Sequence, residues 1–179
     1  MIGVLLAFFT MQVAPHPVFD GDVDWDKEFG MEERVRDPDT GEFPVDPYAQ
    51  DDRNAGAKPF EGSAVAAHFG GKDSIRRIAV RTVELSQSDP RIAAIFAGHD
   101  MVRLRRTLFE QFCYILGAGC TYTGRDMAAA HDAMGVRMGD MNALVENLQQ
   151  AMREEDVPFA AQNRFLAKLA PISHDVIAP

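Results

Sequence analysis

The chain has 179 residues, 46% of them apolar, which is enough for one domain with a hydrophobic core. Its formal net charge of −9 argues against a nucleic-acid-binding protein, which would present a basic patch, and against docking on an anionic membrane surface. No apolar run reaches the roughly 18 residues that a membrane-spanning helix needs. We therefore expect neither a nucleic-acid partner nor a membrane span.

Residues 1–14, MIGVLLAFFTMQVA, contain an apolar stretch with the length of a signal-peptide core. No Lys or Arg precedes this stretch, and Pro15 directly follows Ala14, the best candidate cleavage residue. We interpret the segment as a signal peptide, which predicts export to a bacterial periplasm. The alternatives are a cytoplasmic protein with a buried N-terminal segment, or a start site that lies inside a longer reading frame.

Residues 15–61 are rich in acidic side chains and proline, and they show no helical period of apolar residues. Such a composition buries too little apolar surface to offset the entropy cost of ordering. We expect an acidic, largely irregular extension that acts mainly as a solvated linker. Four aromatic side chains could pin parts of it to the following domain: Trp25, Phe29, Phe43 and Tyr48.

Residues 62–179 show the apolar spacing of helices and are predicted to form an all-α domain, because no alternating segment indicates a β-strand. The predicted helices, each bounded by capping or helix-breaking residues, run from Ser74 to Asp89, from Asp100 to Gly117, from Arg125 to His131, from Met138 to Met152 and from Pro158 to Ile172. The last of these helices is expected to turn Phe159 and Phe165 toward the core.

The chain has two cysteines, Cys113 and Cys120, and no CxxC motif, which excludes a zinc ribbon or a thioredoxin-like site. The pair is either two thiols or one disulfide, depending on the compartment. In an exported protein, a disulfide would clamp the end of the helix that follows Asp100 to the next loop.

His131 is the candidate ligand among five histidines, because the other four lie in loops or near chain ends. It ends a short helix, and Met127 lies one turn before it. A histidine at a helix end is by itself only weak evidence for a metal site.

Four stretches of the chain occur in the order, and with nearly the spacing, of a known family: FGGKDSI, SDPRIAAIFAGHDMVRLRR, YTGRDMAAAHDAMGV and FLAKLAPISHDV. On these stretches the chain resembles the group I truncated haemoglobins, small globins with a two-over-two helical sandwich. The resemblance implies this fold for residues 62–179, with the N-terminal extension outside the family core. It also implies one haem b with His131 as the proximal iron ligand. Neutral imidazole suits iron, and a single proximal histidine leaves the opposite face open for a gas.

The resemblance further implies a haem pocket lined by apolar side chains from several elements. By position these are Phe96 on the haem face, Leu104, Leu108 and Phe112 on the distal helix, and Met127, Val136, Met141 and Leu144 on the proximal and inner walls. Arg105, Arg106 and Tyr122 are the candidates for the haem propionates, since a guanidinium group pairs well with a carboxylate.

The chain departs from the family pattern on the distal side. Many group I members carry a tyrosine and a glutamine at the positions that match Val83 and Leu108, and these donors hold bound oxygen. Leu104 occupies the gate position, and the nearest polar side chains on that helix are Gln111 and Thr107. We therefore expect an unusually apolar distal pocket that retains O2 weakly and favours CO or NO.

Three functions compete at this point. The first is reversible binding of a diatomic gas (O2, CO or NO). The second is a haem redox enzyme, such as an NO dioxygenase, a nitrite reductase or a peroxidase-like enzyme, which would need an external reductase or other electron donor. The third is a globin-shaped partner module without haem, against which His131 and the apolar pocket positions argue. No feature of the sequence indicates an oligomeric state.

Overall fold

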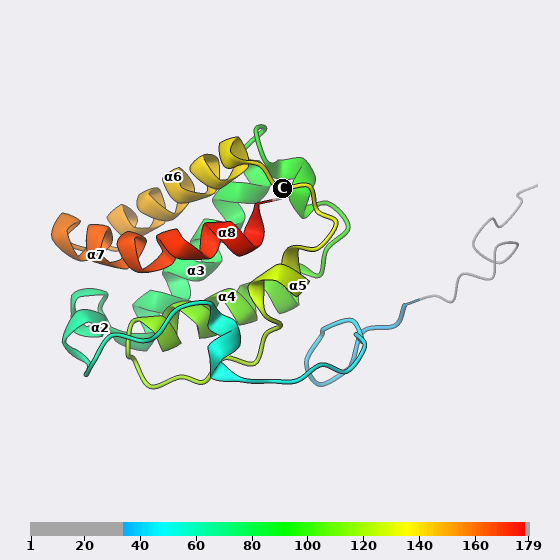
Figure 1. Ribbon diagram of the computed structural model, residues 1–179, viewed down its shortest axis with the longest axis horizontal. Helices are drawn as coiled ribbons and strands as arrows, with labels where there is room; N and C mark the ends of the chain where they lie inside the picture. Colours follow the sequence, from blue (N-terminus) through cyan, green and yellow to red (C-terminus); the bar gives the residue numbers. More distant parts are fainter. Residues whose placement is uncertain (1–33, 178–179) are drawn as a thin grey trace, which may run out of the picture. The chain divides into compact units, whose positions relative to one another are not determined.

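The computed structural model describes residues 34–177, so the expected signal peptide, Trp25 and Phe29 lie outside the described residues. Within that range the chain forms helices and irregular connections without a β-strand, which confirms the all-α class (Figure 1). The helices are η1 (Asp52–Ala55), α2 (Ala64–His68), α3 (Gly71–Ser88), η2 (Ala93–Phe96), α4 (Met101–Ile115), α5 (Met127–His131), α6 (Met138–Glu154), α7 (Phe159–Leu169), η3 (Ala170–Ile172) and α8 (Ser173–Val176). None of these helices is long and apolar enough to cross a membrane.

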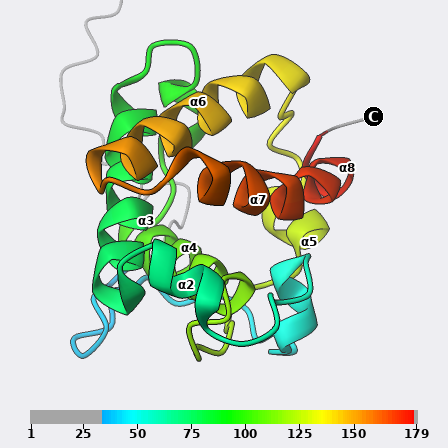
Figure 2. The same ribbon diagram turned by 90° about the vertical axis from the view of Figure 1, so that its left-hand side faces the viewer.

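Helix α3 is the centre of the helix packing, with extensive contacts to both α4 and α6 (Figures 1 and 2). Helices α6 and α7 run antiparallel and pack on each other, and the short α5 contacts α8 (Figure 1). The pairs α3–α4 and α6–α7 form the expected two-over-two sandwich.

Local signals in the sequence explain where the helices start and stop. The Asp100 carboxylate accepts hydrogen bonds from the first backbone N–H groups of α4, and the Asp126 carboxylate accepts one from α5. After α4, Gly117 has φ = +74°, and a Cβ atom there would lie 2.5 Å from the Gly62 carbonyl oxygen. Glycine is therefore required at this turn, both for its left-handed conformation and for the close approach of the chain.

The hydrophobic core is organised around Phe165 of α7, which is fully buried. Its ring packs edge-to-face on Phe69 and on Phe112, with centroid distances of 5.4 and 5.1 Å. Phe159 was also expected on the inner side of this helix, but it is 72% exposed. That expectation is wrong: Val157, just before α7, is buried, but Phe159 lies off the face of the helix that buries Ala161 and Phe165.

The compact unit that contains the helices begins at Val35 and so includes most of the N-terminal extension. Ala55 is fully buried and belongs to the main core cluster, and Glu42 is buried as well. The expectation of a solvated linker is therefore corrected for residues 35–61, which are irregular apart from η1 but packed on the domain. Composition correctly indicated that most of this segment lacks regular structure, but it could not reveal the hydrogen bonds and ion pairs that hold the segment in place.

Candidate functional site

His131 is the last residue of α5, and its ring is oriented by a single local hydrogen bond. The ring Nδ1 lies 2.8 Å from the carbonyl oxygen of Met127, one helical turn earlier. Because a carbonyl can only accept, Nδ1 carries the proton and donates, and the lone pair is left on Nε2. Histidines that bind metals usually donate their other ring N–H in this way, which fixes the tautomer and the ring direction. The imidazole is thus prepared to ligate through Nε2.

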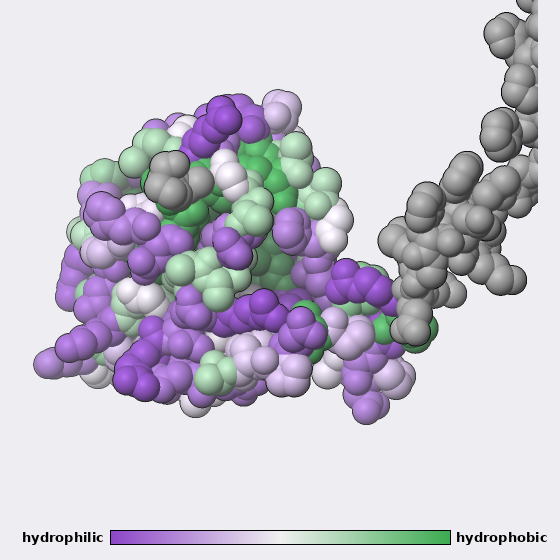
Figure 3. Space-filling view, turned by 45° about the vertical axis from the view of Figure 1, so that its right-hand side comes forward, coloured by the Kyte–Doolittle hydropathy of each residue, from purple (hydrophilic) through white to green (hydrophobic). Residues whose placement is uncertain are grey.

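The apolar residues expected around the haem fall into two groups by burial. Four of them are buried within the domain: Val83, Phe112, Met127 and Val136. Five remain half-exposed although they are large and apolar: Phe96, Leu104, Leu108, Met141 and Leu144. Figure 3 shows a hollow of hydrophobic residues in this domain, bordered by hydrophilic side chains. A concave apolar surface with a few polar groups at its border is the usual form of a cofactor site.

The three residues expected to hold propionates differ in what they contact. Arg106 lies 3.0 Å from a Glu42 carboxylate oxygen and 2.9 Å from one of Glu110, and the Glu42 hydrogen bond is the main reason that the pKa of Arg106 is raised. The buried Tyr122 hydroxyl donates to the Arg125 carbonyl, and burial raises its pKa. Arg105 donates one hydrogen bond, at 3.2 Å, to the Gln87 amide oxygen. Arg105 is therefore the best placed of the three for an anionic partner.

The polar side chains nearest to the expected distal side are engaged in other contacts. The Gln111 amide is buried and donates to the Ala55 carbonyl at 2.9 Å and to the Met127 sulfur at 3.2 Å. The Thr107 hydroxyl donates to the carbonyl of Arg103, one turn earlier in the same helix. Both groups thus have partners within the protein.

Cys113 and Cys120 form a disulfide, and neither is free. The bond joins the last turn of α4 to the loop that leads toward α5. This outcome selects one of the two alternatives that the sequence left open.

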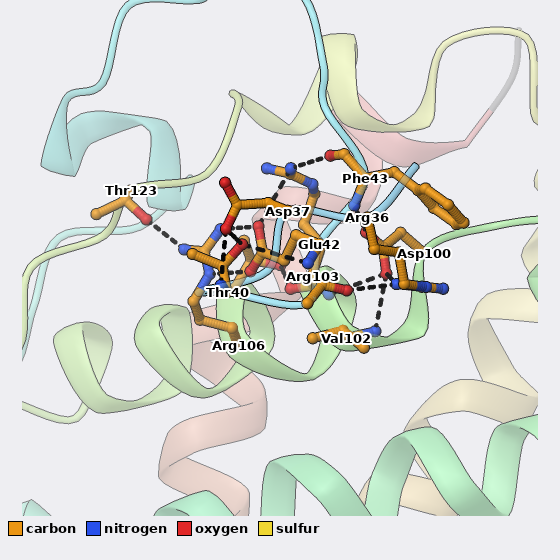
Figure 4. Close-up of polar contacts among 12 residues, drawn as sticks. Arg36, Asp37, Thr40, Glu42, Phe43, Asp100, Val102, Arg103, Arg106 and Thr123 are labelled. Atoms are coloured by element: carbon orange, nitrogen blue, oxygen red, sulfur yellow. Dashed lines mark hydrogen bonds and ion pairs between the residues drawn. The ribbon is translucent and has the colours of Figure 1, made fainter. Parts of the chain in front are cut away.

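Sequence reasoning missed a cluster of charged residues at which the N-terminal extension meets α4 (Figure 4). Glu42 pairs with both Arg103 and Arg106, and Asp100 accepts a hydrogen bond from the backbone N–H of Phe43. Burial acts to raise the pKa of the Asp100 carboxyl, but the hydrogen bonds from Phe43 and Arg36 outweigh it and hold that pKa below its ordinary value. No local pattern marked Glu42, because its partner Arg106 lies 64 residues away.

Comparison with known proteins assigns the chain to a family. Residues 65–178 match the family described as bacterial-like globin. The chain is 23% identical over 116 residues to the group 1 truncated hemoglobin GlbN of Mycolicibacterium paratuberculosis, covering 65% of this chain and 85% of that protein. Because the family match spans more than half of the sequence, the chain belongs to the bacterial-like globin family, and its globin region is of the truncated type.

Two solved structures show the same fold. The truncated hemoglobin from Tetrahymena pyriformis in its Fe(III) form has a TM-score of 0.62 and 21% identity, covering 64% of this chain and 98% of that one. The 2/2 hemoglobin from Synechococcus sp. PCC 7002, in the cyanomet state with covalently attached heme, has a TM-score of 0.57 and 21% identity, covering 63% and 97%. Membership of the globin family implies a haem cofactor, and the orientation of His131 and the apolar hollow fit one.

Proposed function

We propose that this chain binds one haem b non-covalently through His131 and reversibly binds O2, CO or NO on the opposite face of the iron. The observation that carries the proposal is the hydrogen bond from His131 Nδ1 to the Met127 carbonyl, which leaves Nε2 available as a metal ligand. The haem supplies an iron with an open sixth position for a gas. The half-exposed apolar side chains of α4 and α6 would cover the macrocycle and exclude water.

We further propose that the distal side of this site is apolar and retains O2 poorly. Val83 and Leu108 occupy the positions at which many group I members carry hydrogen-bond donors. The Gln111 amide already donates to the Ala55 carbonyl and to the Met127 sulfur. Bound O2 carries partial negative charge, so a charge-assisted hydrogen bond to it contributes about 1.5–3 kcal/mol. Its absence should speed O2 release by roughly ten- to a hundredfold, since about 1.4 kcal/mol corresponds to a factor of ten.

The test is to load the full chain with haem, record ferric, ferrous and CO-bound absorption spectra, and measure the O2 and CO dissociation rates. Leu108→Gln would restore a donor on α4 and should slow O2 release by about ten- to a hundredfold while changing CO release little. Val102→Gln, an exposed position on the same helix, is the matched control and should leave both rates unchanged. Slow O2 release in the unaltered protein would contradict the apolar distal side.

The same preparation separates gas binding from redox catalysis. Catalytic loss of NO, nitrite or peroxide in the presence of an electron donor would favour the enzyme, whereas stoichiometric binding favours a gas carrier or sensor. The acid–acetone extraction of the pigment distinguishes haem b from a covalently attached haem, because only the former leaves the protein.

We also propose that the protein works in an oxidising compartment such as the periplasm, and the Cys113–Cys120 disulfide supports this. For a sequence separation of 7, loop closure in the unfolded chain predicts that the bond contributes about 2 kcal/mol to the free energy of unfolding. Denaturant unfolding with and without reductant should show this loss, and the double variant Cys113→Ala/Cys120→Ala should not respond to reductant. Cell fractionation that finds the protein only in the cytosol, with two free thiols, would contradict the proposal.

A further inference from the structure

We propose that Glu42 is a positioning residue for α4, and that residues 36–60, here termed the belt, set how readily a gas reaches and leaves the iron. The inference rests on the proposed function, because it concerns the rates at that same site. The belt lies outside the residues that match the globin family, which begin at residue 65. This control is therefore an addition of this chain to the family fold.

The belt holds α4 at its first turn. The Asp100 carboxylate, which caps this helix, accepts the backbone N–H of Phe43 at 2.7 Å through its second oxygen. The Arg36 guanidinium donates to the first oxygen at 3.0 Å. The Asp100 carboxylate thus links the first turn of α4 to Phe43 and Arg36 of the belt.

Glu42 contacts the first half of the helix (Figure 4). Its side chain is only 8% exposed and pairs with Arg103 at 3.1 Å and with Arg106. Arg103 also donates to the Phe43 carbonyl at 2.6 Å. A buried carboxylate needs such partners, because an unpaired charge in the interior is strongly unfavourable. The two arginines are one turn apart, so a single carboxylate restrains both the position and the rotation of α4.

The belt also reaches the far end of α4. Gln111 donates to the Ala55 carbonyl at 2.9 Å, and the backbone N–H of Phe60 donates to the Ile115 carbonyl at 2.8 Å. With the contacts at Asp100 and Glu42, the belt contacts α4 at points from its N-cap to its last residue.

The same belt is fastened to the loop that precedes α5. The Tyr48 hydroxyl donates to the Thr123 carbonyl at 2.8 Å, and the Asp52 carboxylate accepts the backbone N–H of Tyr122 at 2.7 Å. Because α5 carries His131, the belt bridges the expected distal helix and the approach to the proximal ligand. Their separation is therefore set partly by residues 36–60.

The restraint of α4 by the belt also affects the expected haem pocket, because the same helix contributes side chains to both. Leu104 directly follows Arg103, and Leu108 lies two residues after Arg106, so the belt and the expected pocket use neighbouring faces of one helix. A helix of this length moves as a unit. Loss of the contacts between the belt and α4 should therefore also increase the mobility of the α4 side chains that face the expected pocket. The expected result is faster access and faster escape of a gas.

The test compares CO rebinding after flash photolysis in the haem-loaded full chain and in Glu42→Gln. The variant should show a higher bimolecular rebinding rate and a smaller geminate fraction, with a change of about two- to thirtyfold, the range typical of mutations along a coupled network. Glu154→Gln is the matched control, because it makes the same chemical change in an exposed ion pair with Arg81 away from the belt. Wild-type rates in a folded Glu42→Gln would overturn the proposal.

A second variant and hydrogen exchange test the proposal even if Glu42→Gln does not fold or the protein takes up no haem. Glu42→Asp retains the charge with a shorter reach and should shift the rates in the same direction by a smaller factor. If Glu42→Gln does not fold, wild-type rates in Glu42→Asp overturn the proposal. If the unaltered protein takes up no haem, the proposed function fails separately. Hydrogen exchange then decides whether Glu42 holds α4: faster exchange of the α4 amides in the variant supports it, and unchanged exchange overturns it.

Discussion

Replacing His131 by alanine is expected to remove the iron ligand and to lower the affinity for haem by more than about a hundredfold. Mutation of a residue that only hydrogen-bonds to a metal ligand lowers the metal affinity by roughly ten- to a hundredfold. Loss of the ligand itself should lower the affinity by more than that. The ring is oriented by a hydrogen bond to the Met127 carbonyl, and removal of the side chain leaves no buried charge. The helical fold should therefore survive, and the loss should be confined to the cofactor.

Haem titration followed by the Soret absorption measures this effect. Added imidazole should partly restore the spectrum in His131→Ala, because it can supply the missing ligand. His99→Ala and His174→Ala are the matched controls, since both side chains are exposed in the structure. Unchanged ferrous and CO spectra in His131→Ala would show that another residue binds the iron.

Replacing Phe165 by alanine is expected to lower the free energy of unfolding by about 3–5 kcal/mol, the range for a fully buried phenylalanine. The ring has 0% exposure and stacks edge-to-face on Phe69 and Phe112. Its removal would open a cavity where α7 meets α4 and the segment after α2. For a chain of this size the melting temperature should fall by roughly 6–20 °C.

Denaturant and thermal unfolding of the full chain test this prediction. Phe159→Ala is the matched control, because it makes the same substitution in the same helix at a position that is 72% exposed. Its free energy of unfolding should change by no more than about 0.5 kcal/mol. Equal losses in the two variants would mean that the core is not organised around Phe165.

The helices of the globin region could be predicted from the sequence because their signals are local. Asp100 caps α4 through backbone groups within three residues, and Gly117 ends the same helix by adopting a left-handed conformation. The main error lay at the start of α7, where the pattern placed Phe159 in the core. Phe159 is apolar, but it lies off the face of α7 that buries Ala161 and Phe165, so its residue type was misleading there.

The candidate site was predicted less completely. The ordered motifs singled out His131, and the structure adds the Met127 carbonyl that orients it. The propionate candidates needed the tertiary structure, because Arg106 is engaged by two carboxylates and Tyr122 by a backbone carbonyl. A side chain's type shows what it can bind, whereas its neighbours decide whether another group already holds it.

The sequence by itself determined the all-α class, because capping residues and apolar spacing act within a few turns, and it determined the family of the globin region, because the family motifs occur in order along the chain. It also singled out His131 as the candidate ligand. Only the tertiary structure decided that residues 35–61 are packed on the domain and that Glu42 anchors α4. Glu42 and Arg106 are 64 residues apart, and no local pattern carries information over that distance. An acidic, proline-rich segment cannot form a core alone, but it becomes ordered when folding brings half-buried cationic partners such as Arg103 and Arg106 to it.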